Sequence, residues 1–456
     1  MTTPPAPPAG LPAPDSSGRA FHGRVWRLAL PIILSNITVP LLGLADTAVV
    51  GRLPGPEYLG AVAIGAVIFN VLYSSLNFLR MGTTGLTAQS FGAKDADQIR
   101  SWLARACLLS VVLGLALVAL QVPILAVSHW IMGPSAAVWP LTEGYFQVRI
   151  WGAPAALANF ALLGWFFGIQ RTGAALATQV FMNGLNIVLD IWFVLGLGWG
   201  VEGVAWATVI SEVSAVGLGF WLAAGRLRAL GGQWRWDRIR DASRLKRMLA
   251  VNGDIFGRSI CLQACFVIFT SAGTRMGDEV LAANAVLLQF LMFASYALDG
   301  FANAAEAMAG EAVGARDRHL FRRAVAATGL WALLFATGFG AAYWAVGPLV
   351  VDLITTVDSV RQTAYAYLPW MAVLPLVSVW SYQLDGIFIG ATWTRAMRNS
   401  MAASLAVFAL LVPLLVPHLG NHGLWAAFTA FMALRGVTMG LAFPRLARRL
   451  GDQPPA

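Results

Sequence analysis

Apolar residues occur along this chain in long stretches that short polar connections separate. A helix needs roughly 20 apolar residues to cross a bilayer, and twelve stretches reach that length. They lie at about 25–50, 58–80, 100–127, 140–169, 174–197, 202–224, 248–273, 279–303, 322–346, 362–391, 399–417 and 422–444. The pattern predicts an all-α integral membrane protein with twelve transmembrane helices.

Composition supports a membrane protein and argues against other classes. The chain is 58% hydrophobic and 12% charged, whereas soluble domains are about 25% charged. Its three cysteines lie in apolar runs and its histidines show no metal-ligand spacing, so we expect no metal site and no cofactor. The net charge of +9 follows the membrane connections, so we expect no nucleic-acid partner.

The sequence repeats once, about its longest polar segment at 226–247. "SFGAKDADQIR" at 90–100 resembles "AVGARDRHLFR" at 312–322, an offset of 222, and Gly168 corresponds to Gly390 at the same offset. Six spans is an even number, so both halves enter the bilayer from the same side. The repeat predicts two six-helix lobes related by a pseudo-twofold axis along the membrane normal, an arrangement typical of transporters.

Basic residues set the expected orientation and domain order. Lys and Arg concentrate in the central segment and in the connections on its side of the membrane, while the opposite side carries Arg52, Arg275 and Arg361. The positive-inside rule therefore places both termini in the cytoplasm. The predicted order is a disordered Pro-rich tail at 1–22, an N-lobe at 23–225, a cytoplasmic linker at 226–247, a C-lobe at 248–446 and a tail at 447–456.

Two aspartates lie inside predicted spans of the N-lobe. A carboxylate at the bilayer centre costs about 2.5 kcal/mol or more, so intramembrane carboxylates usually serve function. Asp46 and Asp190 correspond to Ile268 and Val412 in the second half, so the fold itself does not require them. We favour a functional role for both over simple hydrogen bonding between helices.

Asp190 ends a polar stripe in the stretch "NGLNIVLD". Gln179, Asn183, Asn186 and Asp190 fall within an arc of about 60° on a helix. For Gln179 and Asn183 we expect mainly hydrogen bonds between helices, as amides often provide in membranes.

Other polar or helix-bending residues complete the candidate set. Pro31 and Pro40 can bend the first helix and free backbone carbonyls. In the C-lobe, Asp299 and Asp385 are open to either packing or gating, or to proton transfer. Candidates for the lining of the N-lobe cavity are Asn159, Trp165 and Gln170.

Several stretches resemble the multidrug and toxic compound extrusion (MATE) family, specifically its DinF branch. They are "LALPIILSNITVPLLGLADTAVVGRL", "NGLNIVLD", "LAANAVLLQFLMFASYALDGFANAAEA" and "LDGIFIGATWTRAMRNSM". The likeness extends over about residues 24–445. It implies two six-helix lobes in a V, the MATE fold, which expel substrate by alternating access.

The resemblance also implies a cation site. In the family, an N-lobe site combines two aspartates, an asparagine and a threonine, which match Asp46, Asp190, Asn186 and Thr208. NorM relatives carry a carboxylate pair in the seventh and tenth helices, and we find no equivalent pair here. We therefore expect the coupling ion to bind in the N-lobe. We expect this ion to be H⁺, because the likeness is to DinF. Na⁺ is the alternative, because four oxygen ligands suit it.

The sequence predicts a secondary active multidrug efflux transporter of the bacterial cytoplasmic (inner) membrane. We expect it to act as a monomer and not to be an enzyme. Aspartates and many aromatic residues, among them 18 Trp and 25 Phe, suit lipophilic organic cations through charge and cation–π contact. A lipid-linked oligosaccharide flippase of the same superfamily is the nearer alternative. A membrane-embedded transferase is the alternative from another class.

Overall fold

The computed structural model describes residues 18–449, and all of its regular structure in that range is helical. The first half contains α1 (Gly18–Val50), α2 (Pro56–Leu76), α3 (Phe78–Gly92), α4 (Ala96–Ala119), α5 (Gln121–Met132), α6 (Trp139–Arg149), η1 (Ile150–Gly152), α7 (Ala153–Gly168), α8 (Thr172–Asp190), η2 (Ile191–Gly196) and α9 (Gly200–Leu230). After α10 (Trp236–Ile239), the second half contains α11 (Ala242–Thr274), α12 (Asp278–Gly314), α13 (Arg318–Ile354), α14 (Asp358–Gly390) and α15 (Thr394–Arg449).

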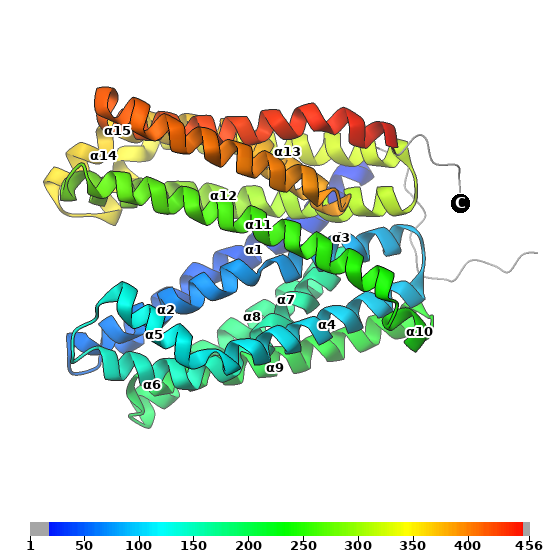
Figure 1. Cartoon of the computed structure of the whole chain (residues 1–456), viewed down its shortest axis with the longest axis horizontal. Helices are drawn as coiled ribbons and strands as arrows, with labels where there is room; N and C mark the ends of the chain where they lie inside the picture. Colours follow the sequence, from blue (N-terminus) through cyan, green and yellow to red (C-terminus); the bar gives the residue numbers. More distant parts are fainter. Residues whose placement is uncertain (1–17, 450–456) are drawn as a thin grey trace, which may run out of the picture.

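These helices form twelve membrane-length segments. Eleven helical stretches in the described range are long and apolar enough to cross a membrane. The last of them, α15, is interrupted at Gly420, where φ is 55° and ψ is −135°. That left-handed backbone suits glycine, and Figure 1 shows α15 reversing direction into two antiparallel legs. The prediction of an all-α membrane protein with twelve transmembrane helices is therefore confirmed.

Helix bounds differ modestly from the expected domain limits. Residues 1–17 of the predicted tail and 450–456 lie outside the described range. Helix α1 begins at Gly18 rather than after residue 22. Helix α9 continues to Leu230 and α11 begins at Ala242, so the connection between the halves is shorter than 226–247.

The helices group into two lobes that meet at one end. Within the first lobe α7 packs on α3 and α4, and within the second α12 packs on α13 and α14. Across the lobes, α12 packs on α1 and α3. Figure 1 shows the two sets of ribbons together at the end that carries α10, here called the linker end, and diverging toward the opposite end, here called the turn end.

The backbone repeats at the offset found in the sequence. The four non-glycine residues of the described range with positive φ are Lys94 and Arg316, both at 55°, and Gln170 and Thr392, at 58° and 52°. Each pair is 222 positions apart. Each of the two corresponding turns also ends in an aspartate that caps the next helix: Asp95 accepts from the Gln98 N–H at 3.0 Å and Asp317 from the Leu320 N–H at 2.9 Å. The repeated feature is thus a turn between two helices in which an aspartate caps the start of the second helix.

Glycine lets the lobes approach closely at the linker end. A side chain at Gly92 would collide with the carbonyl oxygen of Glu311, and a side chain at Gly314 would collide with that of Gln89. These two contacts are related by the same offset of 222. The duplicated glycines therefore form one pseudo-symmetric contact between α3 and α12.

Candidate functional site

The two intramembrane aspartates of the N-lobe lie together. Asp46 lies four residues before the end of α1, and Asp190 ends α8 where η2, a π-helical segment, begins. Asp190 is fully buried and Asp46 is half-buried. Their carboxyl groups lie within hydrogen-bonding reach of each other. Ionised carboxylates only accept hydrogen bonds, so a hydrogen bond between the two would need a proton on one of them.

Asn186 links this carboxyl pair to α9. In the amide orientation that satisfies both neighbours, its nitrogen donates to Asp190 Oδ2 at 2.9 Å, and its oxygen accepts from Thr208 Oγ1 at 3.2 Å. Asn186 is buried and Thr208 half-buried. The structure thus brings together all four residues of the implied cation site, from three helices. Within the described residues no three His, Cys, Asp or Glu side chains cluster as metal ligands do.

The rest of the polar stripe fastens α8 to α1. Asn183 Nδ2 donates to Thr38 Oγ1 at 2.8 Å, and Gln179 Nε2 donates to Asn183 Oδ1 at 3.1 Å. Both amides therefore make hydrogen bonds between or along helices, about two and three turns before Asp190 on α8.

Proline leaves an acceptor free in α1, and α8 satisfies it. Pro31 and Pro40 both lie inside the continuous helix. Pro31 has no N–H for the carbonyl of Arg27, and that oxygen accepts instead from Thr172 Oγ1 at 3.2 Å. A side-chain bond thus replaces the missing backbone bond.

The three residues proposed as cavity lining lie apart from one another. Asn159 is buried and donates to the carbonyl of Glu212 at 3.0 Å. Trp165 is fully buried and donates to the carbonyl of Ile99 at 3.1 Å, so it packs in the core. Gln170 lies at the linker end between the lobes, where it accepts from Arg24 Nη2 at 2.6 Å.

Sequence reasoning missed a buried ion pair in the same lobe. Arg149 of α6 and Glu212 of α9 form two parallel bonds of 2.9 and 2.6 Å, and both side chains are less than 10% exposed. Both residues lie within predicted apolar spans, and a charged residue in such a span indicates a buried partner. Their partnership was hidden because they are 63 positions apart.

In the C-lobe, Asp385 is held by arginines. Arg258 of α11 and Arg435 of α15 each donate to Asp385 Oδ2 at 2.7 Å, and all three side chains are buried. The helix pair that carries two carboxylates in NorM relatives thus carries Arg258 opposite Asp385 here. Asp299 is half-buried and near these charges, but makes no ion pair with any described residue.

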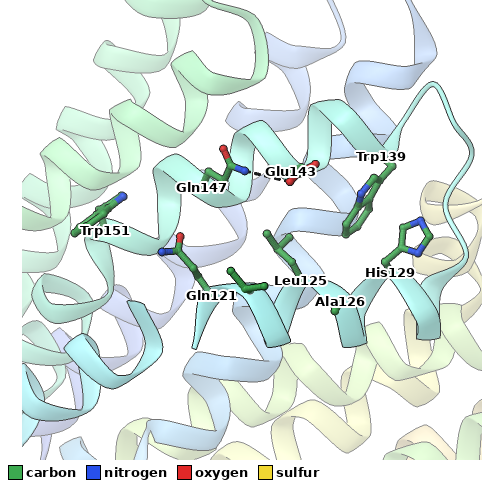
Figure 2. Close-up of a pocket in the computed structure, with 9 residues that line it drawn as sticks. Gln121, Leu125, Ala126, His129, Trp139, Glu143, Gln147 and Trp151 are labelled. Carbon is green, nitrogen blue, oxygen red and sulfur yellow. Dashed lines mark hydrogen bonds between the residues drawn. The ribbon is translucent and has the colours of Figure 1, made fainter. Parts of the chain in front are cut away.

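A hollow in the described part of the chain lies away from this site. It measures about 750 Å³ between α5 and α6 and is lined by Gln121, Val122, Leu125, Ala126, His129, Trp139, Glu143, Gln147 and Trp151. Figure 2 shows Glu143 and Gln147 on one side of this groove, joined by a hydrogen bond of 3.1 Å. None of the predicted site residues lines it.

Comparisons with known proteins agree with this architecture. The MatE family model matches residues 31–192 and 255–415. The chain is 45% identical over 425 residues to DNA damage-inducible protein F of Escherichia coli K12, covering 92% of each. It is 28% identical to the probable multidrug resistance protein NorM of Deinococcus radiodurans, covering 94% of this chain and 96% of that protein.

Solved structures show the same fold. A MATE family transporter of the MOP superfamily in an outward-facing conformation matches with a TM-score of 0.86 at 21% identity, over 95% of this chain and 97% of that one. A MATE structure in the bent conformation gives 0.86 at 22% identity, over 95% and 98%. Together with the family model and the relative that is 45% identical, the two-lobed helical fold shows that this chain belongs to the MATE family of membrane transporters and is not an enzyme.

Proposed function

We propose that this transporter exports lipophilic organic cations in exchange for H⁺, which binds at the Asp46–Asp190 carboxyl pair. The observation that carries the proposal is the closeness of these two carboxyl groups, which lie within hydrogen-bonding reach of each other. Two carboxylates so close repel each other, so a proton bound between them stabilises the pair. Asn186 and Thr208 add neutral polar groups beside it. A site that gains and loses a proton changes charge and can thereby favour one conformation over another.

The arrangement of the lobes supports alternating access. By the positive-inside rule we infer that the linker end is cytoplasmic and the turn end external, with both termini on the cytoplasmic side of the bacterial inner membrane. In this orientation the lobes are in contact on the cytoplasmic side, and half-buried Asp46, one turn from the external end of α1, lies near the external side. Protons from outside would then reach the pair and displace substrate.

Two matching polar clusters hold the cytoplasmic side closed in this conformation. Gln170 Nε2 donates to Glu311 Oε2 at 2.8 Å, and Arg24 of α1 binds both residues. At the equivalent place, Gln89 Nε2 donates to Thr392 Oγ1 at 3.1 Å, and Arg247 of α11 donates to Gln89 Oε1 at 2.7 Å. Gln89 corresponds to Glu311, and Gln170 to Thr392, at the offset of 222. Opening toward the cytoplasm requires both clusters to separate.

The C-lobe favours a drug transporter over a lipid-linked oligosaccharide flippase. A flippase of that superfamily is expected to expose a strongly cationic cavity. Arg258 and Arg435 are buried and both bind Asp385, so they do not line an exposed cavity. We further propose that one chain is sufficient for transport, since both halves of the site come from a single lobe.

The test is efflux of a fluorescent organic cation from proteoliposomes under an imposed pH gradient without Na⁺. We expect efflux by the wild type and none above the protein-free background by Asp190→Asn at matched reconstitution. Glu143→Gln is the matched control, because it removes a carboxylate of the same lobe that lies in the groove between α5 and α6, away from the proposed site (Figure 2). If efflux ignores pH and follows a Na⁺ gradient, the coupling ion is Na⁺ rather than H⁺, bound at the same four residues.

A further inference from the structure

A buried positive charge lies beside the carboxyl pair in the N-lobe. The guanidinium of Arg149 is 5.0 Å from the ring centre of Phe69 and 5.3 Å from that of Tyr73. One edge of it is 3.4 Å from the Tyr73 hydroxyl. These aromatic contacts and its burial confine the guanidinium to one position, at the end of α6.

This charge is within electrostatic reach of Asp46. Glu212, the partner of Arg149, lies on α9 one turn after Thr208, whose hydroxyl is 3.2 Å from the Asn186 amide beside Asp190. Tyr145, one turn earlier on α6, is buried and packs edge-on against Phe69, the same ring that the guanidinium of Arg149 contacts. Nevertheless, in the described chain neither Asp46 nor Asp190 forms an ion pair.

Glu212 takes up the charge of Arg149. The two side chains form a bidentate pair at 2.6 and 2.9 Å, the geometry in which guanidinium and carboxylate match best. Because the pair is neutral overall and satisfies both Nη atoms, its field at Asp46 is that of a dipole rather than of a full positive charge.

We propose that Glu212 is a positioning residue for the cation site: by holding Arg149 in a bidentate pair, it keeps the guanidinium from neutralising Asp46 and Asp190, so that these carboxyl groups can bind and release the coupling ion. The proposal rests on the proposed function of that site. Without Glu212, the positive charge of Arg149 would neutralise the aspartates permanently, in place of the coupling cation.

The titratable groups in and around the carboxyl pair and the Arg149–Glu212 pair come from five helices. Asp46 comes from α1, Tyr73 from α2, Tyr145 and Arg149 from α6, and Glu212 from α9, while Asp190 itself lies on α8. The tyrosines are neutral at working pH, so Arg149 and Glu212 are the two groups whose removal changes the charge facing the site.

The experiment measures the pH at which proteoliposome efflux is half-maximal in four variants. Glu212→Gln frees the charge of Arg149, which favours ionised aspartates, so the half-maximal pH should fall by about one unit or more. Arg149→Gln frees the charge of Glu212 and should raise the half-maximal pH. The double variant Arg149→Gln/Glu212→Gln removes both charges and should return to the wild-type value. Glu143→Gln should also match the wild type.

The opposite signs separate positioning from a merely structural role. A structural role lowers the amount of folded protein or its maximal rate without moving the half-maximal pH in opposite directions. Unchanged half-maximal pH in both single variants, or a double variant displaced as far as Glu212→Gln, overturns the proposal. If Glu212→Gln does not fold, the proposal is tested by the half-maximal pH of the other two variants. This pH should rise in Arg149→Gln and return to the wild-type value in the double variant.

Failure of proton coupling is distinguishable from failure of this inference. If wild-type efflux follows Na⁺ and ignores pH, the proposed proton exchange is wrong. The same variants are then compared by the Na⁺ concentration for half-maximal efflux. It should rise at least tenfold in Glu212→Gln and recover in the double variant, and no rise would overturn the positioning role.

Discussion

Glu311→Gln should loosen the cytoplasmic closure while leaving the carboxyl pair intact. The substitution keeps the shape of the side chain but removes the charge that binds Arg24. The equivalent position in the other half, Gln89, already carries glutamine and still binds an arginine. The variant therefore makes the two clusters chemically alike without removing either.

The size of the effect follows from exposure. Hydrogen bonds to charged groups contribute about 1.5–3 kcal/mol. The side chains of Arg24 and Glu311 are 30% and 17% exposed, so solvent screening leaves about 1–1.5 kcal/mol. A difference of about 1.4 kcal/mol is a factor of ten. The ratio of cytoplasm-open to cytoplasm-closed molecules should therefore rise about five- to tenfold.

The assay is a distance measurement between spin labels on the two lobes. Ala93→Cys and His319→Cys place labels at exposed positions of the N-lobe and C-lobe at the linker end, after Cys107, Cys261 and Cys265 are replaced by alanine. We expect Glu311→Gln to increase the long-distance population. Gln89→Glu, which gives Arg247 a carboxylate partner, should decrease it. The same distance distribution in all three proteins would refute the reasoning.

Other predictions follow from the two lobes. Asp46→Asn and Asp190→Asn should each abolish coupled efflux while the protein still inserts, because a neutral amide costs less to bury than a charge; normal efflux at equal expression would remove the site. In intact cells, a cysteine at residue 133 should react with an impermeant thiol reagent and one at 232 should not, and the reverse would overturn the orientation. Asp385→Asn leaves two buried arginines without a carboxylate and should cost about 3–5 kcal/mol of stability, seen as a lower melting temperature in detergent; an unchanged melting temperature would show that the ion pairs contribute little.

The sequence was sufficient for the fold because its two main signals are local. Length of apolar stretches predicts spans, and the final two predicted stretches appear as the two legs of α15 around Gly420. The repeat at offset 222 reappears as paired left-handed residues such as Lys94 and Arg316. Neither signal depends on which side of a helix a residue occupies.

Side-chain partnerships depend on helix faces, and there the sequence was insufficient. Trp165 and Gln170 looked equally able to line a cavity, yet one is in the core and the other at the contact between lobes. The sequence left Asp385 open to packing, gating or proton transfer, because its two arginine partners come from helices far away in sequence. Rotation of each helix about its axis decides such contacts, and one sequence does not specify that rotation.

The confinement of the carboxyl pair to one lobe has an energetic consequence. The equivalent positions in the second half are Ile268 and Val412. If the pair of Asp46 and Asp190 alternates between one shared proton and none, one proton enters for each substrate molecule that leaves. For a monovalent organic cation that exchange moves no net charge, so the membrane voltage, worth about 2.3 kcal/mol per charge per 100 mV, does no work on it. The pH difference alone then sets the limit, about tenfold accumulation for each unit, and such a pump would fail in cells whose proton-motive force is mainly electrical.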